Sequence, residues 1–339
     1  MAVIIAEGWK NYADKSEVVF GWPLHASVPV NAGFAEISGR RTLDLYGGKV
    51  AREFAPRRRV CVHFVADLTA GALSSTLWSV GLNPPNIASA AYTAPSGDRF
   101  RVEATATQIR VLRQPFNPDG TLVSSSQTVA SVNHSMTAGS SYRVEILADV
   151  TGDTGTVEVM VNGVTVIAVD FSRAIGNYAC DAPFGIVSLY AVGSTGSRGR
   201  ISNLILYDDA APTQWPIGPQ NISYLPAQAN AGETISFPPL LTDPEILVDT
   251  TAGKTWQLGD VAGVSASSVK TVFGLVRMSA PDALTPASAD VLFQDGASVL
   301  SAETHIIQPG TPVYDRQIVI PTSDPAVLNR MTLTVKRTS

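Results

Sequence analysis

The chain has 339 residues, of which 45% are apolar and 16% charged, and its formal net charge is −5. This length favours two domains, and the apolar fraction is large enough for packed cores, which excludes wholesale disorder. The densest basic cluster is Arg57-Arg58-Arg59. We interpret it as a solvated strand end because an apolar run follows from Val60, so nothing in the composition favours nucleic-acid binding.

No segment predicts secretion or membrane insertion. Residues 1–9 lack a basic region and contain a short apolar run, so they do not resemble a signal peptide. No apolar run approaches the length that crosses a bilayer. The two cysteines, Cys61 and Cys180, lie beside apolar or small residues, and we expect reduced core thiols made in the cytosol. A disulfide between them is the alternative.

The first 140 residues predict a succession of short strands. Apolar and polar residues alternate in several runs, and turn residues separate these runs by about ten positions, which is typical of a sandwich or jelly roll. The loop at 115–120 contains Asn-Pro-Asp-Gly turn chemistry. Strands are expected at 3–5, 18–20, 41–46, 59–67, 77–82, 88–92, 99–104, 108–113 and 127–132.

The strongest pattern runs from Tyr142 to Asp170. Three β-rich runs are joined there by two tight turns, and the second turn is Asn162-Gly163. Both residues tolerate the positive φ angles of a type I′ turn, so this pair between alternating apolar residues predicts a hairpin. The segment therefore predicts a three-stranded antiparallel meander and an all-β domain. Two further strands are expected at 185–192 and 200–207.

Residues 210–238 are rich in proline, which removes ladder donors and stiffens the chain. We expect an ordered connector in which Trp215 and Tyr224 pack onto one of two domains, at 1–209 and 239–339. The second domain should be a small β-sandwich, with residues 258–265 as a helical turn or a loop. Its strands are expected at 268–279, 289–293, 299–307, 316–320 and 331–336.

Glycoside hydrolysis requires two carboxylates at a fixed separation. The candidates are Glu145, Asp149 and Glu158, but they do not show the close same-face spacing that a catalytic pair on one strand would have. We interpret them as solvent-facing carboxylates that alternate with core residues. No catalytic residue is predicted, because the chain also lacks a Gly-x-Ser-x-Gly elbow and a phosphate-binding loop.

Metal and cofactor sites are not predicted either. The four histidines, His25, His63, His134 and His305, show no ligand spacing, and His63 is expected to pack against a sheet. The turn from Asp149 to Asp153 clusters oxygen atoms that calcium could use, but it does not match an EF-hand loop. We interpret it as a plain Asp/Gly turn.

Polar loops at the rims of a sandwich can recognise sugars or proteins. Three aromatic residues, Trp78, Tyr92 and Tyr190, could stack on a sugar ring if they were exposed, although each is favoured as a core residue.

Residues 142–170, 185–190 and the closing run Ile201-Ser-Asn-Leu-Ile-Leu-Tyr207 resemble concanavalin A-like or laminin-G-like jelly rolls. Such domains carry a strand, Val-Asn-Gly, strand hairpin and a last strand of similar sequence. The resemblance covers residues 1–209 and implies an all-β chain, with an N-terminal concanavalin A-like jelly roll followed by a smaller C-terminal β-sandwich. It is more specific to the fold than to a function.

The second half contains a stretch from Thr255 to Val264 and a strand that starts at Ser268. These segments are similar to C-terminal regions of tailed-bacteriophage virion proteins. This resemblance implies a non-enzymatic structural component of the tail, baseplate, fibre or head, assembled in the bacterial host cytoplasm. Its expected partners are other virion proteins, host surface glycan and further copies of itself, with a trimer as the expected state. The alternatives are a carbohydrate-binding lectin or adhesin module, and a glycoside hydrolase.

Overall fold

The protein is described here by a computed structural model. Its described residues are 2–10, 12, 14–15, 18, 22, 25–27, 33–71, 76–84, 100–114, 127–172, 174–175, 178–179, 183–190, 199–208, 215–220, 222, 227–233, 253–259, 272–280, 284–309, 314–320, 322 and 324–338.

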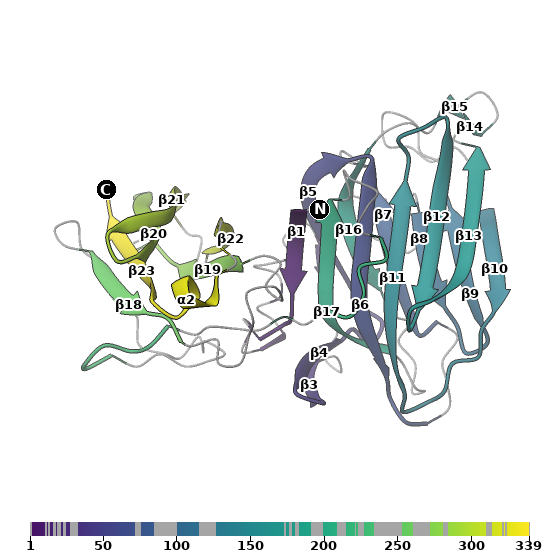
Figure 1. Ribbon diagram of the computed structural model, residues 1–339, viewed down its shortest axis with the longest axis horizontal. Coiled ribbons are helices and arrows are strands. Elements are labelled where there is room, and N and C mark those ends of the chain that lie inside the picture. The colour runs from purple at the N-terminus through teal and green to yellow at the C-terminus, as the bar shows by residue number, and fades with distance from the viewer. Residues whose placement is uncertain are drawn as a thin grey trace. The chain divides into compact units, whose positions relative to one another are not determined.

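The chain divides into two compact units. The larger unit comprises Met1–Trp9 and Asp14–Ile222, and the smaller unit comprises Lys10–Ala13 and Ser223–Ser339. Strands make up most of the described residues of both units, which confirms the all-β prediction (Figure 1). The predicted limits of the connector, 210–238, stay a prediction.

The larger unit is a jelly roll of two antiparallel sheets (Figure 1). Sheet A has the order β13-β12-β11-β6-β17-β4-β3, and β1 pairs with β17. Its strands are β1 (Ala2–Glu7), β3 (Gly33–Ile37), β4 (Arg40–Asp44), β6 (Arg59–Leu68), β11 (Ser141–Asp149), β12 (Thr154–Val161), β13 (Val164–Ser172) and β17 (Gly199–Asp208).

Sheet B has the order β10-β9-β8-β7-β16-β5-β2. Its strands are β2 (His25–Ser27), β5 (Lys49–Arg57), β7 (Trp78–Asn83), β8 (Phe100–Ala104), β9 (Gln108–Arg113), β10 (Gln127–Asn133) and β16 (Phe184–Tyr190). A two-stranded ribbon of β14 (Ala174–Ile175) and β15 (Tyr178–Ala179) lies between β13 and β16 in the chain.

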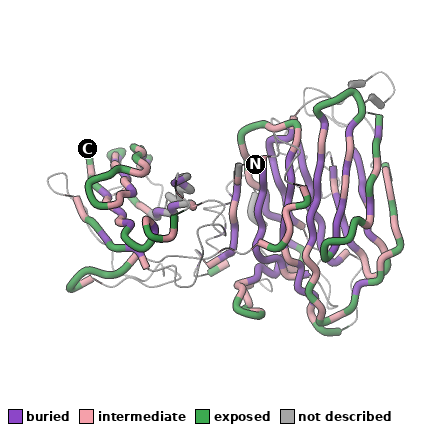
Figure 2. The backbone as a smooth tube through the Cα atoms, viewed as in Figure 1, coloured by how far each residue is buried: buried purple, intermediate pink, exposed green. Residues whose placement is uncertain are grey.

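The core of the larger unit forms between the two sheets because alternate side chains of each strand point inward. Trp78 of sheet B packs edge-on against Phe64 of sheet A, with 5.1 Å between the ring centroids. Phe100 of sheet B likewise contacts Phe171 of sheet A. Burial is continuous along the central strands, whereas turns and sheet edges are exposed (Figure 2).

The predicted meander is confirmed as β11, β12 and β13, which are hydrogen-bonded neighbours. At its second turn, Asn162 has φ 51° and Gly163 has φ 82°, as a type I′ turn requires. The side-chain oxygen of Asn162 also accepts a hydrogen bond from the backbone N–H of Arg143, at 2.9 Å. The turn residues therefore fix the register that the hydrophobic alternation prefers.

Gly155 provides room for an aromatic ring on the neighbouring strand. It lies opposite Phe171, and a Cβ added at Gly155 would stand 2.2 Å from the ring carbon Cζ. We predict that Gly155→Ala lowers the free energy of unfolding by about 1–3 kcal/mol, because the ring must leave its place against Phe100. Urea denaturation measures this loss, and Gly152→Ala, at an exposed turn position, is the matched control. Equal stability of the two variants would contradict the prediction.

Most expected strands of the larger unit are present, within a few residues of their predicted ends. Strands β2, β3 and β5 were not predicted. β5 contains Pro56 and a charged Arg52-Glu53 pair, and it is held by pairing with β16 and β2 rather than by a strong local pattern. The strand expected at 88–92 lies outside the described residues. Of the strand expected at 18–20, only Val18 is described, and it is not in a strand.

The smaller unit holds a four-stranded sheet, β18-β23-β20-β21, and a two-stranded sheet, β19-β22, whose apolar residues share one core. Its elements are β18 (Lys254–Gln257), β19 (Val272–Met278), β20 (Ala287–Asp295), β21 (Ser298–Ile307), β22 (Tyr314–Ile320), α2 (Pro325–Leu328) and β23 (Met331–Arg337). The expected strands are confirmed where they are described. Helix α2 was not predicted, although Asp324 caps it by accepting from Ala326 N–H and Pro325 follows the cap.

No helix among the described residues is both long enough and apolar enough to span a membrane.

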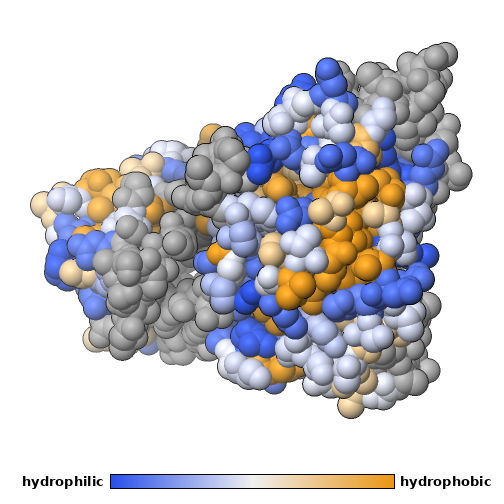
Figure 3. Space-filling model, turned by 45° about the vertical axis from the view of Figure 1, so that its right-hand side comes forward, coloured by the Kyte–Doolittle hydropathy of each residue, from blue (hydrophilic) through white to orange (hydrophobic). Residues whose placement is uncertain are grey.

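The surface of the larger unit is mixed, and the face drawn in Figure 3 has an apolar area bordered by hydrophilic residues.

Candidate functional site

The outer face of sheet B is polar, although its inner face is apolar. Strands β7 and β8 alternate, so that Trp78, Val80 and Leu82 point into the core and the residues between them point away from it. Across the sheet, one residue from each of six neighbouring strands lies in cross-strand register. This polar row consists of Lys49, Tyr190, Ser79, Glu103, Arg110 and Ser131.

Exposure rises along the polar row toward β10. Lys49, Ser79 and Glu103 are at most 5% exposed, whereas the side chain of Arg110 is 36% exposed and Ser131 is exposed. Nearby, Gln108 Nε2 donates to Asn133 Oδ1 at 3.4 Å. The end of the row over β8, β9 and β10 is therefore the part that a ligand could reach.

Glu103 is held between two guanidinium groups. Arg101 Nε lies 3.2 Å from Glu103 Oε2, and Arg110 Nη2 contacts Glu103 Oε1. Arg101 is on the same strand two residues away, and Arg110 is directly opposite on β9, so all three side chains leave the same face of the sheet. Glu103 therefore pairs with both arginines, through a charge-assisted hydrogen bond from Arg110 and an ion pair with Arg101.

Ser79 lies beside this cluster and leaves a polar atom without a partner. Its side chain is 1% exposed, it is directly opposite Glu103 on β8, and its Oγ makes no hydrogen bond. Burying a hydroxyl group without a hydrogen-bond partner costs free energy, so the position of Ser79 among charged groups calls for an explanation.

The three aromatic candidates have different places. Trp78 is a core residue, as favoured, and Tyr190 is half-buried in the polar row. Tyr92 lies outside the described residues.

Sheet A carries the predicted carboxylates on its outer face, and the prediction that Glu145 faces solvent is wrong. Glu145 is 1% exposed because residues 215–220 and 222, which we call the strap, lie over it. Glu145 Oε2 accepts from the backbone N–H groups of Ile217 and Gly218, at 2.9 and 3.1 Å. Its other oxygen accepts from Arg143 Nε at 3.1 Å. Glu145 therefore anchors the strap.

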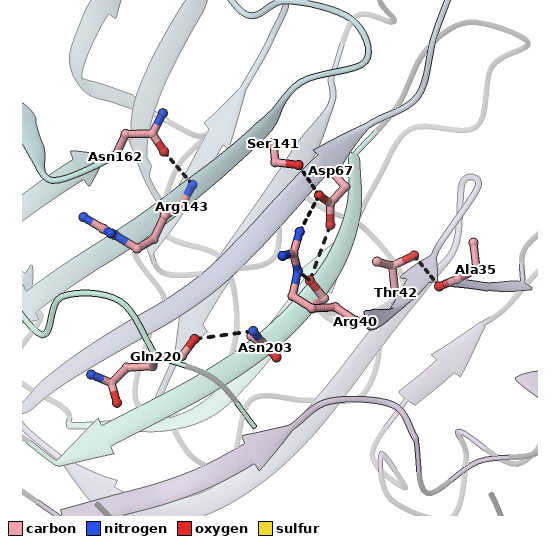
Figure 4. Close-up of polar contacts among 10 residues, drawn as sticks. Ala35, Arg40, Thr42, Asp67, Ser141, Arg143, Asn162, Asn203 and Gln220 are labelled. Carbon is pink, nitrogen blue, oxygen red and sulfur yellow. Dashed lines mark hydrogen bonds and ion pairs between the residues drawn. The ribbon is translucent and has the colours of Figure 1, made fainter. Parts of the chain in front are cut away.

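The apolar part of the strap also packs on sheet A. Trp215, Ile217 and Ile222 lie against Cys61, Leu147, Ile205 and Tyr207. Asn203 Nδ2 donates to Gln220 O at 3.4 Å, as Figure 4 shows. The expectation that Trp215 packs onto a domain is thus confirmed, and Tyr224 lies outside the described residues. Burial raises the pKa of Tyr207 above its usual range, and the charge of Glu145 adds to this effect.

The remaining predicted carboxylates also have protein partners. Asp149 ends β11 and accepts from the backbone N–H and hydroxyl of Thr151, and it pairs with Arg59 at 3.3 Å. Glu158 accepts from Thr165 Oγ1 at 3.0 Å. Four residues separate Glu145 from Asp149, which corresponds to roughly 13 Å along a strand. No group of three metal-ligating side chains occurs in the described part of the chain.

A second polar cluster surrounds Asp67 on sheet A. Arg40 Nη2 donates to Asp67 Oδ1 at 2.9 Å, and Ser141 donates to the same oxygen (Figure 4). Ser202 Oγ donates to the other oxygen at 3.4 Å. Both oxygens of this buried carboxylate are thus engaged, and the cluster ties β4, β6, β11 and β17 together.

Within the described residues, the arginine cluster and Cys61 have structural positions. Arg57 and Arg59 end β5 and begin β6, and each pairs with a carboxylate, Asp208 and Asp149 respectively. This agrees with the interpretation as a strand end. Cys61 is a buried thiol on the outer face of sheet A. Cys180 lies outside the described residues, so a disulfide between them is untested.

His63 packs against a sheet, as predicted. It is fully buried on β6 beneath the strap, and its Nδ1 lies 3.2 Å from Asn203 O. The pKa of His63 is lowered from 6.5 to about 4, mainly by burial and also by the charge of Arg143, while the hydrogen bond to Asn203 opposes the shift.

We predict a loss of stability in acid from this histidine. His63 takes up its proton near pH 6.5 in the unfolded chain but near pH 4 in the folded protein. The free energy of unfolding should therefore fall by about 3 kcal/mol as the pH is lowered from 6.5 to about 4. The contribution is complete above pH 6.5. Urea denaturation from pH 7 to pH 4 measures it, and His63→Gln should flatten this part of the profile, with His134→Gln as control. Identical profiles for wild type and His63→Gln would contradict the prediction.

Comparisons with known proteins give the fold alone. No family model matches the chain, and no curated protein matches it. Solved structures that are similar include a sialidase, at 16% identity over 61% of this chain and 19% of the sialidase, with a TM-score of 0.38. The alginate lyase Aly36B matches at 16% identity over 60% of this chain and 95% of the lyase, with a TM-score of 0.35.

The carbohydrate recognition domain of Emp46p matches at 10% identity over 60% of this chain and 94% of that domain, with a TM-score of 0.39. This chain spans about a fifth of the length of the sialidase. These proteins include enzymes and a sugar-binding domain, so the function must be argued from the site itself. Nothing in these comparisons points to a virion protein, and the virion location, the virion partners and the trimeric state stay predictions.

Proposed function

We propose that this protein is a lectin-like carbohydrate-binding protein whose larger unit binds glycan on the outer face of sheet B. The observation that carries the proposal is the polar row, in which six strands present polar or aromatic side chains in register. A ligand can reach the row at its end over β9 and β10, where the side chain of Arg110 is 36% exposed and Ser131 is exposed.

The chemistry of the row suits a sugar. Sugar rings present hydroxyl groups that both donate and accept hydrogen bonds, together with apolar faces. The row and its neighbours on the same face provide guanidinium donors at Arg101 and Arg110, amide groups at Gln108 and Asn133, and an aromatic ring at Tyr190. Strands hold these groups, so little conformational entropy is lost when a ligand binds.

The same face favours binding over hydrolysis. Canonical glycoside hydrolysis needs two carboxyl groups within about 10 Å of each other. Glu103 is the one carboxylate of the polar row, and both of its oxygens are paired with arginine. Glu53, on the same face, lies on β5, three strands from β8, which corresponds to roughly 14 Å.

A glycan array tests the proposal. Labelled wild-type protein should bind a restricted set of glycans, and Arg110→Ala should lose most of this signal. Arg330→Ala removes an exposed arginine of the smaller unit, which pairs with Asp295, and serves as the matched control. If wild type binds no glycan, or if Arg110→Ala binds as wild type does, the proposed function is wrong.

A further inference from the structure

We infer that the polar row selects acidic glycans, whose carboxylate or sulfate groups are bound by Arg110 and Arg101. This inference rests on the proposed function and narrows its ligand class. Its basis is a surplus of charged donors over acceptors among the described side chains of the row.

The surplus follows from the two guanidinium groups. Each guanidinium carries five N–H donors and no acceptor. Arg101 reaches Glu103 through Nε and Arg110 reaches it through Nη2, and the structure records no other polar partner for either side chain among the described residues. Several guanidinium donors therefore remain without a polar partner in the described part of the chain, while both oxygens of the neighbouring carboxylate are already engaged.

The charge balance points the same way. Two guanidinium groups face one carboxylate, so the cluster of Arg101, Glu103 and Arg110 keeps a net charge of +1. Guanidinium groups bind carboxylate and sulfate through pairs of parallel N–H bonds, and this geometry is less favourable for a neutral hydroxyl.

The ligand should lie toward β9 and β10. Arg110 is the most exposed member of the cluster, and Ser131 beyond it is exposed. An acidic group placed there can contact Arg110 from the side away from Glu103, which would repel it.

Calorimetric titration of the full chain with matched probes tests this inference. Oligogalacturonate and its methyl ester share the same sugar backbone, but the ester is neutral. A sulfated oligosaccharide and its desulfated form make the second pair and distinguish sulfate from carboxylate recognition. We expect at least one acidic probe to bind about tenfold or more tightly than its neutral partner, and to weaken when salt rises from about 50 mM to about 500 mM.

Variants locate the effect. Arg110→Gln should weaken binding of the preferred acidic probe by about tenfold and reduce its salt dependence, whereas Arg110→Lys, which keeps the charge, should retain more affinity. Arg330→Gln is the control, and melting curves establish that each variant is folded. If acidic and neutral probes bind equally, the selectivity is wrong but glycan binding stands. If Arg110→Gln and Arg330→Gln bind alike, the position is wrong, and if no probe or arrayed glycan binds, both proposals fail.

Discussion

Replacing Trp78 with alanine is expected to lower the free energy of unfolding of the larger unit by about 3–5 kcal/mol. Trp78 is fully buried and contacts Phe64 of the opposite sheet at 5.1 Å between ring centroids. The substitution removes a large apolar side chain and leaves a cavity between the sheets, which the paired strands on either side cannot close. Urea denaturation measures this loss from the unfolding transition that Trp78→Ala shifts.

Trp78→Phe is the matched control because it keeps an aromatic ring at the same position. Trp78→Phe should lower the free energy of unfolding by less than Trp78→Ala. The indole N–H of Trp78 makes no hydrogen bond, so no hydrogen bond is lost when it is removed. An alanine variant as stable as Trp78→Phe would show that the two sheets do not share the core described above.

The second large effect is expected at Glu145, where Glu145→Ala should destabilise the larger unit by about 3–5 kcal/mol. The substitution leaves the N–H groups of Ile217 and Gly218 without their acceptor, and it leaves Arg143 without its paired charge. Since these N–H groups lie in the strap, the strap should detach from sheet A before the sheets themselves separate.

Hydrogen exchange distinguishes this local effect from general instability. The amides of Ile217 and Gly218 should exchange markedly faster in Glu145→Ala, whereas amides in the centre of β6 and β11 should remain protected under native conditions. Glu145→Gln keeps the shape and one acceptor oxygen, so it should lose less. Unchanged exchange at Ile217 and Gly218 would mean that Glu145 does not hold the strap.

The strands that could be predicted from sequence are those with a strong local pattern. The meander of β11, β12 and β13 shows strict alternation and an Asn-Gly turn, and its register follows from these two features. β5 could not be predicted because its pairing with β16 and β2 outweighs its own weak preference. Helix α2 is short, but Asp324 before Pro325 was a usable sign of a helix start.

The sites were harder to predict because they depend on which strands are neighbours. The alternation around Ser79, Glu103 and Arg110 signals one polar face on each strand, but it does not show that these three residues meet. Glu145 was expected in solvent because its own strand alternates. Only the distant strap, 72 residues further along the chain, explains its burial.

The position of a bound glycan is the most direct test of this account. A crystal structure of the full chain with the glycan that binds most tightly should show the sugar on the outer face of sheet B, over β8, β9 and β10, within hydrogen-bond distance of Arg110. A sugar bound instead to sheet A or to the smaller unit, with the outer face of sheet B empty, would contradict the account.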